Sequence, residues 1–422
     1  MKILMLGWEF APFVTGGLGR ACEKIVDELI EIGHEVDFVF PKCASSTSRE
    51  GLRIFGIEDF PNFPREGKIK LQQFVGAQKH PAARTAMLEV PLMPYSSYLP
   101  DQAALVDRAS NEAMNPYAGN LFATVESYAN LVVENFADPG YDAIHAHDWL
   151  TFPAAQILAG KLGIPFVAHF HSLESDRNPH APNQLIMDIE QSAVENASIV
   201  VSVSSYTVRC LQQRYGLNPE VARVVHNGSN TFGHGDSINF DEGQSEPQVL
   251  FVGRLTAQKG VQNLCAIAQE VLKLCPQARF VIAGEGDLAG HLKRQIQLAG
   301  LAEKFELVGL LQGPAVSEAY KKASVLMMPS LSEPFGLVAT EATEYGLATV
   351  LSISSGVSEI LPHAFRADPS DPQRFGQMVS LLLKNPEVRK SVAKQSRADM
   401  AAHTWKRTAK LISNVYSEAV RF

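Results

Sequence analysis

Residues 2–40 read KILMLGWEFAPFVTGGLGRACEKIVDELIEIGHEVDFVF, with two apolar runs separated by an amphipathic stretch. The runs KILMLGW (2–8) and HEVDFVF (34–40) predict strands. The stretch between them has apolar residues three or four positions apart, which predicts a helix over about 18–32. Gly33 follows in the position where glycine often ends a helix. This strand–helix–strand order predicts a βαβ unit and a parallel, doubly wound sheet.

The same alternation returns later in the chain, first over 121–228 and again over 248–353. Residues 44–120 are rich in Pro, Gly and Ser, and we interpret them as strands and long loops. The polar segment 229–247 predicts a linker. We therefore expect two α/β domains, 1–240 and 241–403. In such sheets ligands bind at the carboxyl ends of the strands, so we expect the site in a cleft between the domains.

Length and composition agree with two globular domains. The chain has 422 residues, more than the ~250–300 at which a single core stops growing. Hydrophobic residues make up 46% and charged residues 19%, as in soluble enzymes. No apolar run approaches the ~20 residues that span a bilayer, and the N-terminus lacks the pattern of a signal peptide. The five scattered cysteines include no CxxC, so we expect a cytoplasmic protein without structural zinc.

Charge is distributed unevenly between the halves. Residues 1–240 carry 17 basic and 27 acidic side chains, whereas residues 241–422 carry 20 and 18. The acidic first half disfavours nucleic acid and anionic membranes as partners. An anionic cofactor or substrate is better accommodated by the second half.

The segment VTGGLGR (14–20) follows the first strand and begins the first helix. Gly16 and Gly17 would let backbone N–H groups approach an anion at the helix N-terminus. The alternative is a loop with two permissive glycines. The segment is not the GxGxxG fingerprint of dinucleotide-binding proteins, which argues against an NAD(P) oxidoreductase.

Two histidine pairs end the predicted strands 141–147 and 164–171. Alternation along a strand sends His145 with His147, and His169 with His171, to the same face. Four histidines suggest a metal site, but no carboxylate has the spacing of HExxH, and we expect none. We predict structural roles for His145 and His169 and ligand contact for His147 and His171.

The segment VGRLTAQKG (252–260) follows the first strand of the second domain. Arg254 and Lys259 lie in a short loop before a helix. Two cations near a helix N-terminus suit a diphosphate. The alternative is a pair of solvated surface cations.

The segment SLSEPFGLVATEA (330–342) contains two acids eight positions apart. We predict a helix over 335–346 with Glu333 as its cap, Pro334 at its first position and close backbone approach at Gly336. The alternative is a capped amphipathic helix with a solvated Glu341. The small and apolar neighbours of Glu341 instead predict a mostly buried helix, in which that carboxylate needs a polar partner or ligand.

Together these motifs resemble the retaining glycosyltransferases of family 4, which have the GT-B fold: two Rossmann-like doubly wound domains that face each other across a cleft. The features that carry the resemblance are VGRLTAQKG, AGEGD (283–287), SVLMMPSLSEPFGLVATEA, SSGVSEIL (354–361) and VVHNGSN (224–230). In the first domain, GGLG, HAHDW and the strand ending at His171 resemble the glycogen and starch synthase branch. AHFHSLESDR resembles sucrose-phosphate-synthase-like enzymes.

In the second domain, the resemblance implies a site for a nucleotide-sugar donor. Arg254 and Lys259 would bind the diphosphate and stabilise the charge that develops on it. Glu341 would accept hydrogen bonds from the ribose, and Glu333 would hold hydroxyls of the donor sugar. Backbone N–H groups near the sugar and phosphate would come from Phe335, Gly336 and Leu337.

For the first domain, the resemblance implies contacts to the donor and a site for the acceptor. Gly16 and Gly17 would close on the diphosphate, and His171 would contact the donor sugar near its reacting carbon. His147 and Asp148 are candidates for the acceptor side. The last helix, about 404–422, is expected to return to the first domain.

The reaction implied is retaining transfer of a hexose, with glucose preferred, from a UDP-, GDP- or ADP-sugar to a hydroxyl of a sugar, glycan or small molecule. It would need no metal and no cofactor beyond the nucleotide sugar. Val14 replaces the lysine of the Lys-x-Gly-Gly motif in glycogen and starch synthases, which weakens the expectation of α-glucan elongation. The alternatives are an epimerase-like GT-B enzyme that does not transfer the sugar and a non-catalytic nucleotide-sugar-binding protein.

Overall fold

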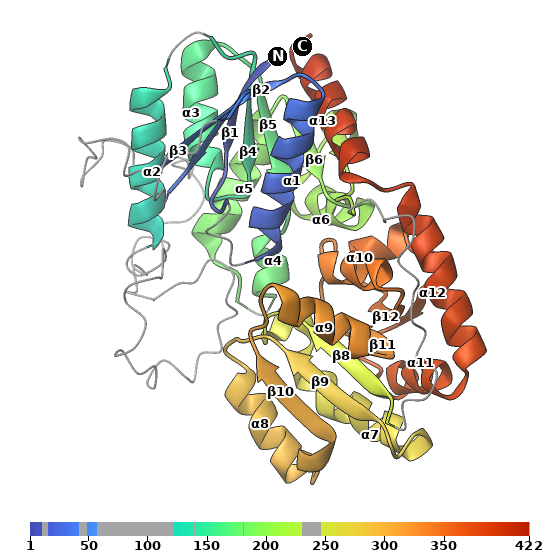
Figure 1. The fold of residues 1–422 in the computed structure, drawn as a ribbon. Helices are drawn as coiled ribbons and strands as arrows, with labels where there is room; N and C mark the ends of the chain where they lie inside the picture. The colour runs from blue at the N-terminus through green and yellow to red at the C-terminus, as the bar shows by residue number, and fades with distance from the viewer. Residues whose placement is uncertain are drawn as a thin grey trace. The chain divides into compact units, whose positions relative to one another are not determined.

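The computed structural model describes residues 1–10, 16–41, 49–56, 121–137, 140–179, 181–229 and 246–421 (Figure 1). These residues belong to two compact units, one of Met1–Val225 with Trp405–Phe422 and the other of His226–Thr404. The expected boundary at 240, most of the expected linker and most of 44–120 lie outside the described residues. So does Val14.

The first unit is built on a sheet of seven parallel strands in the order β3-β2-β1-β4-β5-β6-β7. Strands β1 to β3 follow one another toward one edge of the sheet, and β4 to β7 follow one another toward the other edge. The direction of the strand order therefore reverses between β1 and β4. Parallel sheets bind ligands at this kind of switch point. The strands are β1 (Lys2–Leu6), β2 (Glu35–Phe40), β3 (Leu52–Gly56), β4 (Ala143–His147), β5 (Phe166–Phe170), β6 (Ile199–Ser202) and β7 (Ala222–Val224).

Register brings the carboxyl ends of three central strands of this sheet together. Leu6 of β1 pairs with Ala146 of β4, and His147 of β4 pairs with His169 of β5. The residues that directly follow β1, β4 and β5 therefore lie side by side. This sheet edge carries the residues predicted for the first domain.

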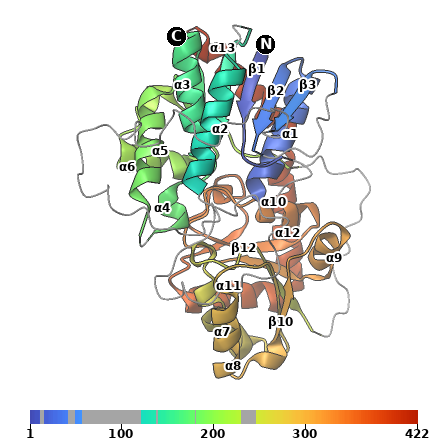
Figure 2. The same ribbon diagram turned by 90° about the vertical axis from the view of Figure 1, so that its left-hand side faces the viewer.

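Both faces of the sheet are covered by helices. One face packs on α2 (Leu121–Asn135), α3 (Phe152–Leu162) and α5 (Gln184–Asn196), with α2 beside α3 in Figure 2. The other face is covered by α1 (Gly17–Glu31) and by the last helix, α13 (Trp405–Ala419), which runs along α1 in Figure 1.

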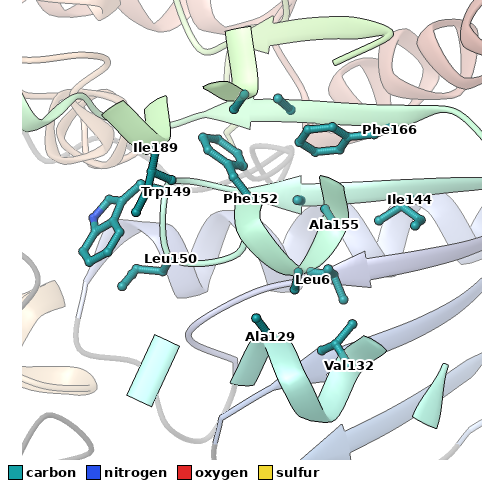
Figure 3. Close-up of a cluster of buried hydrophobic side chains, with 14 of the residues drawn as sticks. Leu6, Ala129, Val132, Ile144, Trp149, Leu150, Phe152, Ala155, Phe166 and Ile189 are labelled. Atoms are coloured by element: carbon teal, nitrogen blue, oxygen red, sulfur yellow. The ribbon is translucent and has the colours of Figure 1, made fainter. Parts of the chain in front are cut away.

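The core on the α2–α3–α5 face is fully buried, and burial of its large apolar side chains is the main stabilising term. Trp149, Phe152 and Phe166 are each at most 2% exposed. Figure 3 shows strand residues of this core meeting helix residues, among them Leu6, Ala129, Val132, Ile144, Leu150, Ala155 and Ile189.

Local signals explain where several of these helices begin and end. The side chain of Asn183 accepts hydrogen bonds at the start of α5, and that of Ser204 does so at the start of α6 (Ser205–Tyr215). Gly163 ends α3 in the left-handed conformation. In contrast, α1 begins after Gly16, which has no side chain to cap it. Its first backbone N–H groups are left for other partners.

The second unit contains a sheet of six parallel strands in the order β10-β9-β8-β11-β12-β13. Here the order reverses between β8 and β11, so the ends of β8, β11 and β12 are neighbours. The strands are β8 (Gln248–Val252), β9 (Arg279–Ala283), β10 (Phe305–Gly309), β11 (Val325–Met328), β12 (Ala348–Ser352) and β13 (Phe365–Ala367).

In the described part of the second unit, the α-helices around the sheet are α7 (Leu264–Leu274), α8 (Ala289–Leu298), α9 (Pro314–Lys322), α10 (Leu337–Glu344), α11 (Pro372–Lys384) and α12 (Pro386–Ala401). In Figure 2, α7 lies against α11, where a β-carbon at Gly376 would come within 2.5 Å of the β-carbon of Glu270. No helix in the described parts of the chain is both long and apolar enough to cross a membrane. The predicted fold class, two Rossmann-like α/β domains, is confirmed.

Candidate functional site

Glycines fix the loop that carries Arg254. The Gly253 N–H donates to the Ala283 carbonyl at 3.0 Å, and the Leu255 N–H donates to the Glu285 carbonyl at 2.8 Å. A β-carbon at Gly284 would overlap the Gly253 carbonyl, and one at Gly286 would overlap the Leu255 carbonyl. Only residues without a side chain permit this backbone contact. AGEGD therefore supports the loop after β8.

A third close approach brings Lys259 to the loop after β11. Gly260 has a φ of +72°, and a β-carbon there would overlap the Pro329 carbonyl. The Leu331 N–H donates to the Gln258 carbonyl at 2.8 Å. These contacts place the ammonium of Lys259 2.6 Å from Oε2 of Glu333.

Glu333 is buried, with 6% exposed, yet only one of its carboxylate oxygens is occupied. Its Oε2 accepts from Lys259 Nζ and from Ser330 Oγ, the latter at 3.0 Å. Its Oε1 accepts no hydrogen bond from any residue that the structure describes. An ionised carboxylate has about four acceptor positions. Oε1 is therefore available to a ligand hydroxyl.

The prediction that Glu333 caps a helix over 335–346 is wrong. Helix α10 begins at Leu337, and its N-cap is Gly336 with a φ of +112°. Residues before Gly336 instead pair with the loop after β12: the Glu333 N–H donates to the Ser354 carbonyl, and the Val357 N–H donates to the Phe335 carbonyl. The pairing holds the Glu333 backbone in a bridge to Ser355, so that it does not enter the helix.

Helix α10 begins without a side-chain cap, and Glu341 lies in its second turn, half-buried. Glu341 Oε2 accepts a hydrogen bond from the Tyr320 hydroxyl at 2.8 Å. The Tyr320 ring stacks on that of Tyr345, with 5.2 Å between centroids. The predicted polar partner of Glu341 is thereby confirmed.

The remaining residues predicted for this domain lie around the same loops. Arg254 is half-buried, and its Nη2 donates to Gln258 Oε1 at 3.4 Å. Phe335 is buried, with its ring 6.3 Å from that of His226, whereas Leu337 is half-buried at the start of α10.

In the first unit, four histidines form one cluster at the ends of β4 and β5. His145 Nε2 lies 3.1 Å from His169 Nδ1, and His147 Nδ1 lies 2.8 Å from His171 Nε2. His145 Nδ1 bonds the Tyr416 hydroxyl of α13 at 2.7 Å. The prediction that each pair shares one face is confirmed. His171 is half-buried, and its Nδ1 has no partner in the described part of the chain.

Asp148 positions the end of β5 from the neighbouring strand. Its φ is +59°, the left-handed region that aspartate tolerates better than most residues. Its Oδ1 accepts from the backbone N–H of His171 at 2.7 Å and of Ser172 at 3.3 Å. Asp148 and His147 are both buried, at 1% and 0% exposed, whereas His171 is half-buried. Their acceptor role stays a prediction.

Gly16 and Gly17 lie at the uncapped start of α1. The Gly16 N–H donates to Oε2 of the buried Glu9 at 3.2 Å, and Gly17 is exposed. Burial raises the pKa of the Cys22 thiol, and the nearby Asp148 and Glu9 raise it further. Because Leu6 of β1 pairs with Ala146 of β4, the residues that follow β1 lie beside the end of β4.

Two family profiles match the chain one after the other. The profile of Glycosyltransferase Family 4 matches residues 100–231, and that of Glycosyl transferases group 1 matches residues 237–399. The chain belongs to the family 4 glycosyltransferases of the GT-B fold. The matches cover the loops of Arg254, Lys259 and Glu333 in the second unit and the histidine cluster of the first.

Curated relatives resemble this glycosyltransferase along its whole length. An uncharacterised glycosyltransferase of Methanocaldococcus jannaschii is 25% identical and is matched over 100% of this chain and 99% of its own. A glycogen synthase of Mycobacterium tuberculosis is 24% identical over 100% of this chain and 95% of its own.

Solved structures share the fold at lower identity. The sucrose-phosphate synthase of Thermosynechococcus elongatus superposes with a TM-score of 0.75 at 19% identity, over 99% of this chain and 98% of its own. Anabaena HepE in complex with UDP and glucose has a TM-score of 0.67 at 17% identity, over 99% of this chain and 100% of its own. At these identities, the likeness establishes the architecture alone.

Burial keeps the histidines of this glycosyltransferase neutral. It lowers the pKa of His145 to about 3, with a smaller contribution from His171, and that of His171 to about 3. It also lowers the pKa values of His147 and His169. Burial raises the pKa of Asp148 to about 6, although Arg177 and the two backbone N–H groups oppose the rise.

Neutral histidines could in principle bind a metal. One ring nitrogen from each of His145, His147 and His169 lies within 4.8 Å of the others. However, His145 and His169 bond each other, and His147 bonds His171. A tetrahedral site would require these bonds to break and the nitrogens to move closer inside a packed core.

The motif analysis missed three residues that contact the predicted ones: Ser330, Tyr320 and Glu9. Glu9 follows the end of β1 and could have been found from that position, where parallel sheets carry ligand-binding residues. Ser330 lies three residues before Glu333 and could have been proposed as its donor. Tyr320 meets Glu341 from another helix, which no local pattern indicates.

Proposed function

We propose that this glycosyltransferase moves a hexose, with glucose as the first candidate, from a nucleotide-diphosphate sugar to a hydroxyl of a sugar, glycan or small molecule. Transfer proceeds with retention and without a metal. In this proposal, the second unit is the donor domain and the first unit is the acceptor domain. The observation that carries it is the Lys259–Glu333 pair, held by glycine-tight loops, with Glu333 Oε1 open to a sugar hydroxyl.

The donor's diphosphate is bound by Arg254 and Lys259. An ammonium has three N–H donors, and Lys259 uses one of them for Glu333. The other two are available to phosphate oxygens. The uncapped N–H groups at the start of α10 supply further donors near the diphosphate. These groups stabilise the negative charge that develops on the leaving diphosphate, the role that a metal takes in other phosphate chemistry.

Glu333 binds hydroxyls of the donor sugar through Oε1, and Glu341 binds the ribose. The Tyr320 hydroxyl orients the Glu341 carboxylate for this contact. The base is that of a UDP-, GDP- or ADP-sugar. The UDP and glucose bound in the HepE structure, which shares this fold, support UDP-glucose as the first donor to test.

His171 contacts the donor sugar near its anomeric carbon through Nδ1, the ring nitrogen that His147 does not use. The acceptor oxygen attacks that carbon on the face from which the diphosphate leaves. As the new C–O bond forms, the bond from the anomeric carbon to the phosphate oxygen breaks. The leaving phosphate oxygen takes the acceptor's proton, so configuration is retained. Gly16 and Gly17 present backbone N–H groups to the diphosphate.

The direct test is a panel of UDP-, GDP- and ADP-sugars, scored by release of the nucleoside diphosphate with and without sugar acceptors, and repeated in excess EDTA. The proposal expects acceptor-dependent release from one donor class that is unchanged by EDTA. A changed nucleotide sugar without release would favour the epimerase-like alternative. Binding without turnover would favour the non-catalytic one. Loss of activity in EDTA would favour a metal at the histidine cluster.

We also propose a cytoplasmic location. The described cysteines Cys22, Cys210, Cys265 and Cys275 are free thiols, as the reducing cytoplasm favours.

A further inference from the structure

A buried charged cluster lies directly behind the end of β5. Its centre is Arg177, the last residue of the short helix α4 (Glu174–Arg177), whose side chain is 2% exposed. Arg177 Nη1 donates to Ser172 Oγ at 2.7 Å, and Nε donates to Glu174 Oε2 at 3.3 Å. Its Nη2 donates to Glu190 Oε1 at 3.2 Å. The guanidinium therefore joins the loop after β5 to helix α5.

Glu190 is fully buried on α5, and its position is fixed independently of Arg177. Its Oε2 accepts from the Tyr215 hydroxyl at 2.6 Å, and its Oε1 accepts from the Glu174 N–H at 2.8 Å. Glu174 Oε1 in turn accepts from the Asn183 N–H at 3.0 Å. The two carboxyl groups thus form a rigid socket for the guanidinium.

Stability alone does not account for this arrangement. Desolvation of a buried cation and its acids costs about as much as their attraction returns, and well-packed apolar residues are often at least as stabilising. A buried arginine can instead fix the positions of the groups that it binds, because the N–H donors of its planar guanidinium have fixed directions. Here one arm of the fork reaches Ser172, the residue directly after His171.

The loop that carries His171 is therefore fixed from two sides. From β4, Asp148 Oδ1 accepts the backbone N–H groups of His171 and Ser172. From α4, Arg177 binds the Ser172 side chain. With the His147 contact to its ring, His171 has its backbone, its ring and its neighbour all fixed.

We propose that Arg177, held by Glu174 and Glu190, is a positioning residue that aims His171 at the donor sugar by fixing Ser172. This inference rests on the proposed role of His171. Arg177 itself touches no substrate, because its guanidinium is enclosed by protein groups. A misplacement of about 1 Å at a reacting centre can cost on the order of a hundredfold in rate.

Arg177→Met tests the proposal, because it keeps the aliphatic stem and removes the fork. We expect kcat to fall at least about tenfold while KM for the donor stays within about threefold. Arg177→Lys, which keeps the charge but replaces the planar fork with a single donor nitrogen, should recover part of kcat. Arg209→Met, at an exposed arginine on α6, is the matched control and should change neither constant.

Ser172→Ala guards against the case in which Arg177→Met does not fold. It removes only the hydroxyl that Arg177 binds and leaves both carboxyl partners of Arg177 in place, so circular dichroism should show a folded protein while kcat falls. If Arg177 acts through Ser172, the double variant should lose no more activity than Arg177→Met alone. Additive losses would contradict the mechanism.

An NMR readout separates this inference from the proposed function. In protein with ¹⁵N-labelled histidine, the His171 ring signals are assigned with His171→Gln. Arg177→Met and Ser172→Ala should shift or broaden the His171 signals, whereas Arg209→Met should not. Unchanged signals, or a kcat within twofold of the parent in both variants, would overturn the positioning role. If the parent turned over no donor, the proposed function would fail, and the ring signals would still decide the role of Arg177.

Discussion

Lys259 links the two loops of the proposed donor site through Glu333, so its removal should have two effects. Under the proposal, Lys259→Ala takes away a hydrogen-bond donor to the diphosphate. It also leaves the buried Glu333 with Ser330 as its one side-chain donor among the described residues. We expect kcat/KM for the nucleotide sugar to fall at least tenfold, about 1.4 kcal/mol of transition-state stabilisation, in steady-state assays of diphosphate release.

The matched control is Lys273→Ala, which removes an exposed lysine paired with Glu270 on α7. It should leave kcat/KM unchanged. Circular dichroism should show both variants folded. If Lys259→Ala turned over donor like the parent, the assignment of this site would be wrong.

Glu341 accepts a hydrogen bond from the Tyr320 hydroxyl, which allows a graded test of the proposed ribose contact. Glu341→Ala should lower kcat/KM for the donor at least tenfold. Tyr320→Phe removes a single hydrogen bond and should cost about two- to tenfold. Tyr345→Phe, on the stacked ring that bonds Ser317 instead, should have little effect. Equal losses in the two tyrosine variants would contradict a specific role for the bond from Tyr320 to Glu341.

At the residue level, sequence reasoning selected candidates where chemistry is local, and their roles stay predictions. Arg254 and Lys259 could be selected because two cations in a loop after a strand suit a diphosphate. The two acids could be selected because the small and apolar residues around them predict burial, where a carboxylate needs a polar partner or ligand. The partner of Lys259 could not be predicted from the residues alone, because the ion pair joins positions 74 residues apart. The burial of His147 and Asp148 could not be predicted from the sequence either, since it depends on helices from distant parts of the chain.

At the level of elements, Gly260 decides how closely the loop after β8 approaches the loop after β11. Gly260→Ala would add both left-handed strain of roughly 1–2 kcal/mol and an overlap with the Pro329 carbonyl. We expect a loss in the free energy of unfolding clearly above that range, measured by urea titration. Donor turnover should fall as well, because Lys259 moves with the loop.

Gly300 provides the control, because its φ of +68° is nearly the same and no atom lies within 4 Å of its added β-carbon. Gly300→Ala should reduce the free energy of unfolding only by the cost of the left-handed strain, and it should keep its activity. If the two variants were equally destabilised, close approach of the loops would not be the reason for glycine at position 260.

The elements that sequence predicted best are the buried parallel strands, because they read as continuous apolar runs between helices. The start of α10 was predicted wrongly because Pro334 and an acid look like a helix beginning. The decisive contact, between residues 333–335 and 354–357, is made by a loop after another strand. Short elements such as α4 and β13 carry too few residues for a periodic signal.

At the level of the whole molecule, the neutral histidine cluster makes stability depend on pH. The pKa values of His145 and His171 are lowered to about 3, from about 6.5 in an unfolded chain. The folded state binds fewer protons between these values, so the stabilisation is complete above pH 6.5 and is lost as pH falls toward 3. For one such histidine, the free energy of unfolding falls by on the order of 2 kcal/mol as the pH falls from 6.5 to 5.

Two buried acids change the free energy of unfolding with pH in the direction opposite to the histidines. Burial raises the pKa of Asp148 to about 6 and that of Glu190 to about 8. These groups favour the folded state at low pH, and the contribution of Glu190 is lost as pH rises from about 4.5 through 8. Urea titrations from pH 5 to 8.5 should therefore show a maximum. Glu190→Gln should remove the decline on the alkaline side only; a curve unchanged by it would contradict the raised pKa.

The first unit consists of two separate stretches of chain, because α13 follows the whole of the second unit in sequence. As the ribosome makes the protein, the strand that contains His145 emerges early, yet the Tyr416 hydroxyl that bonds this ring is translated 271 residues later. A nascent chain that ends at Thr404 therefore already includes all of the second unit, while one face of the first sheet still lacks its last helix. Domains usually complete their folding from the N-terminus onward during synthesis. Here the order is reversed, and the half of the enzyme that begins first is finished last.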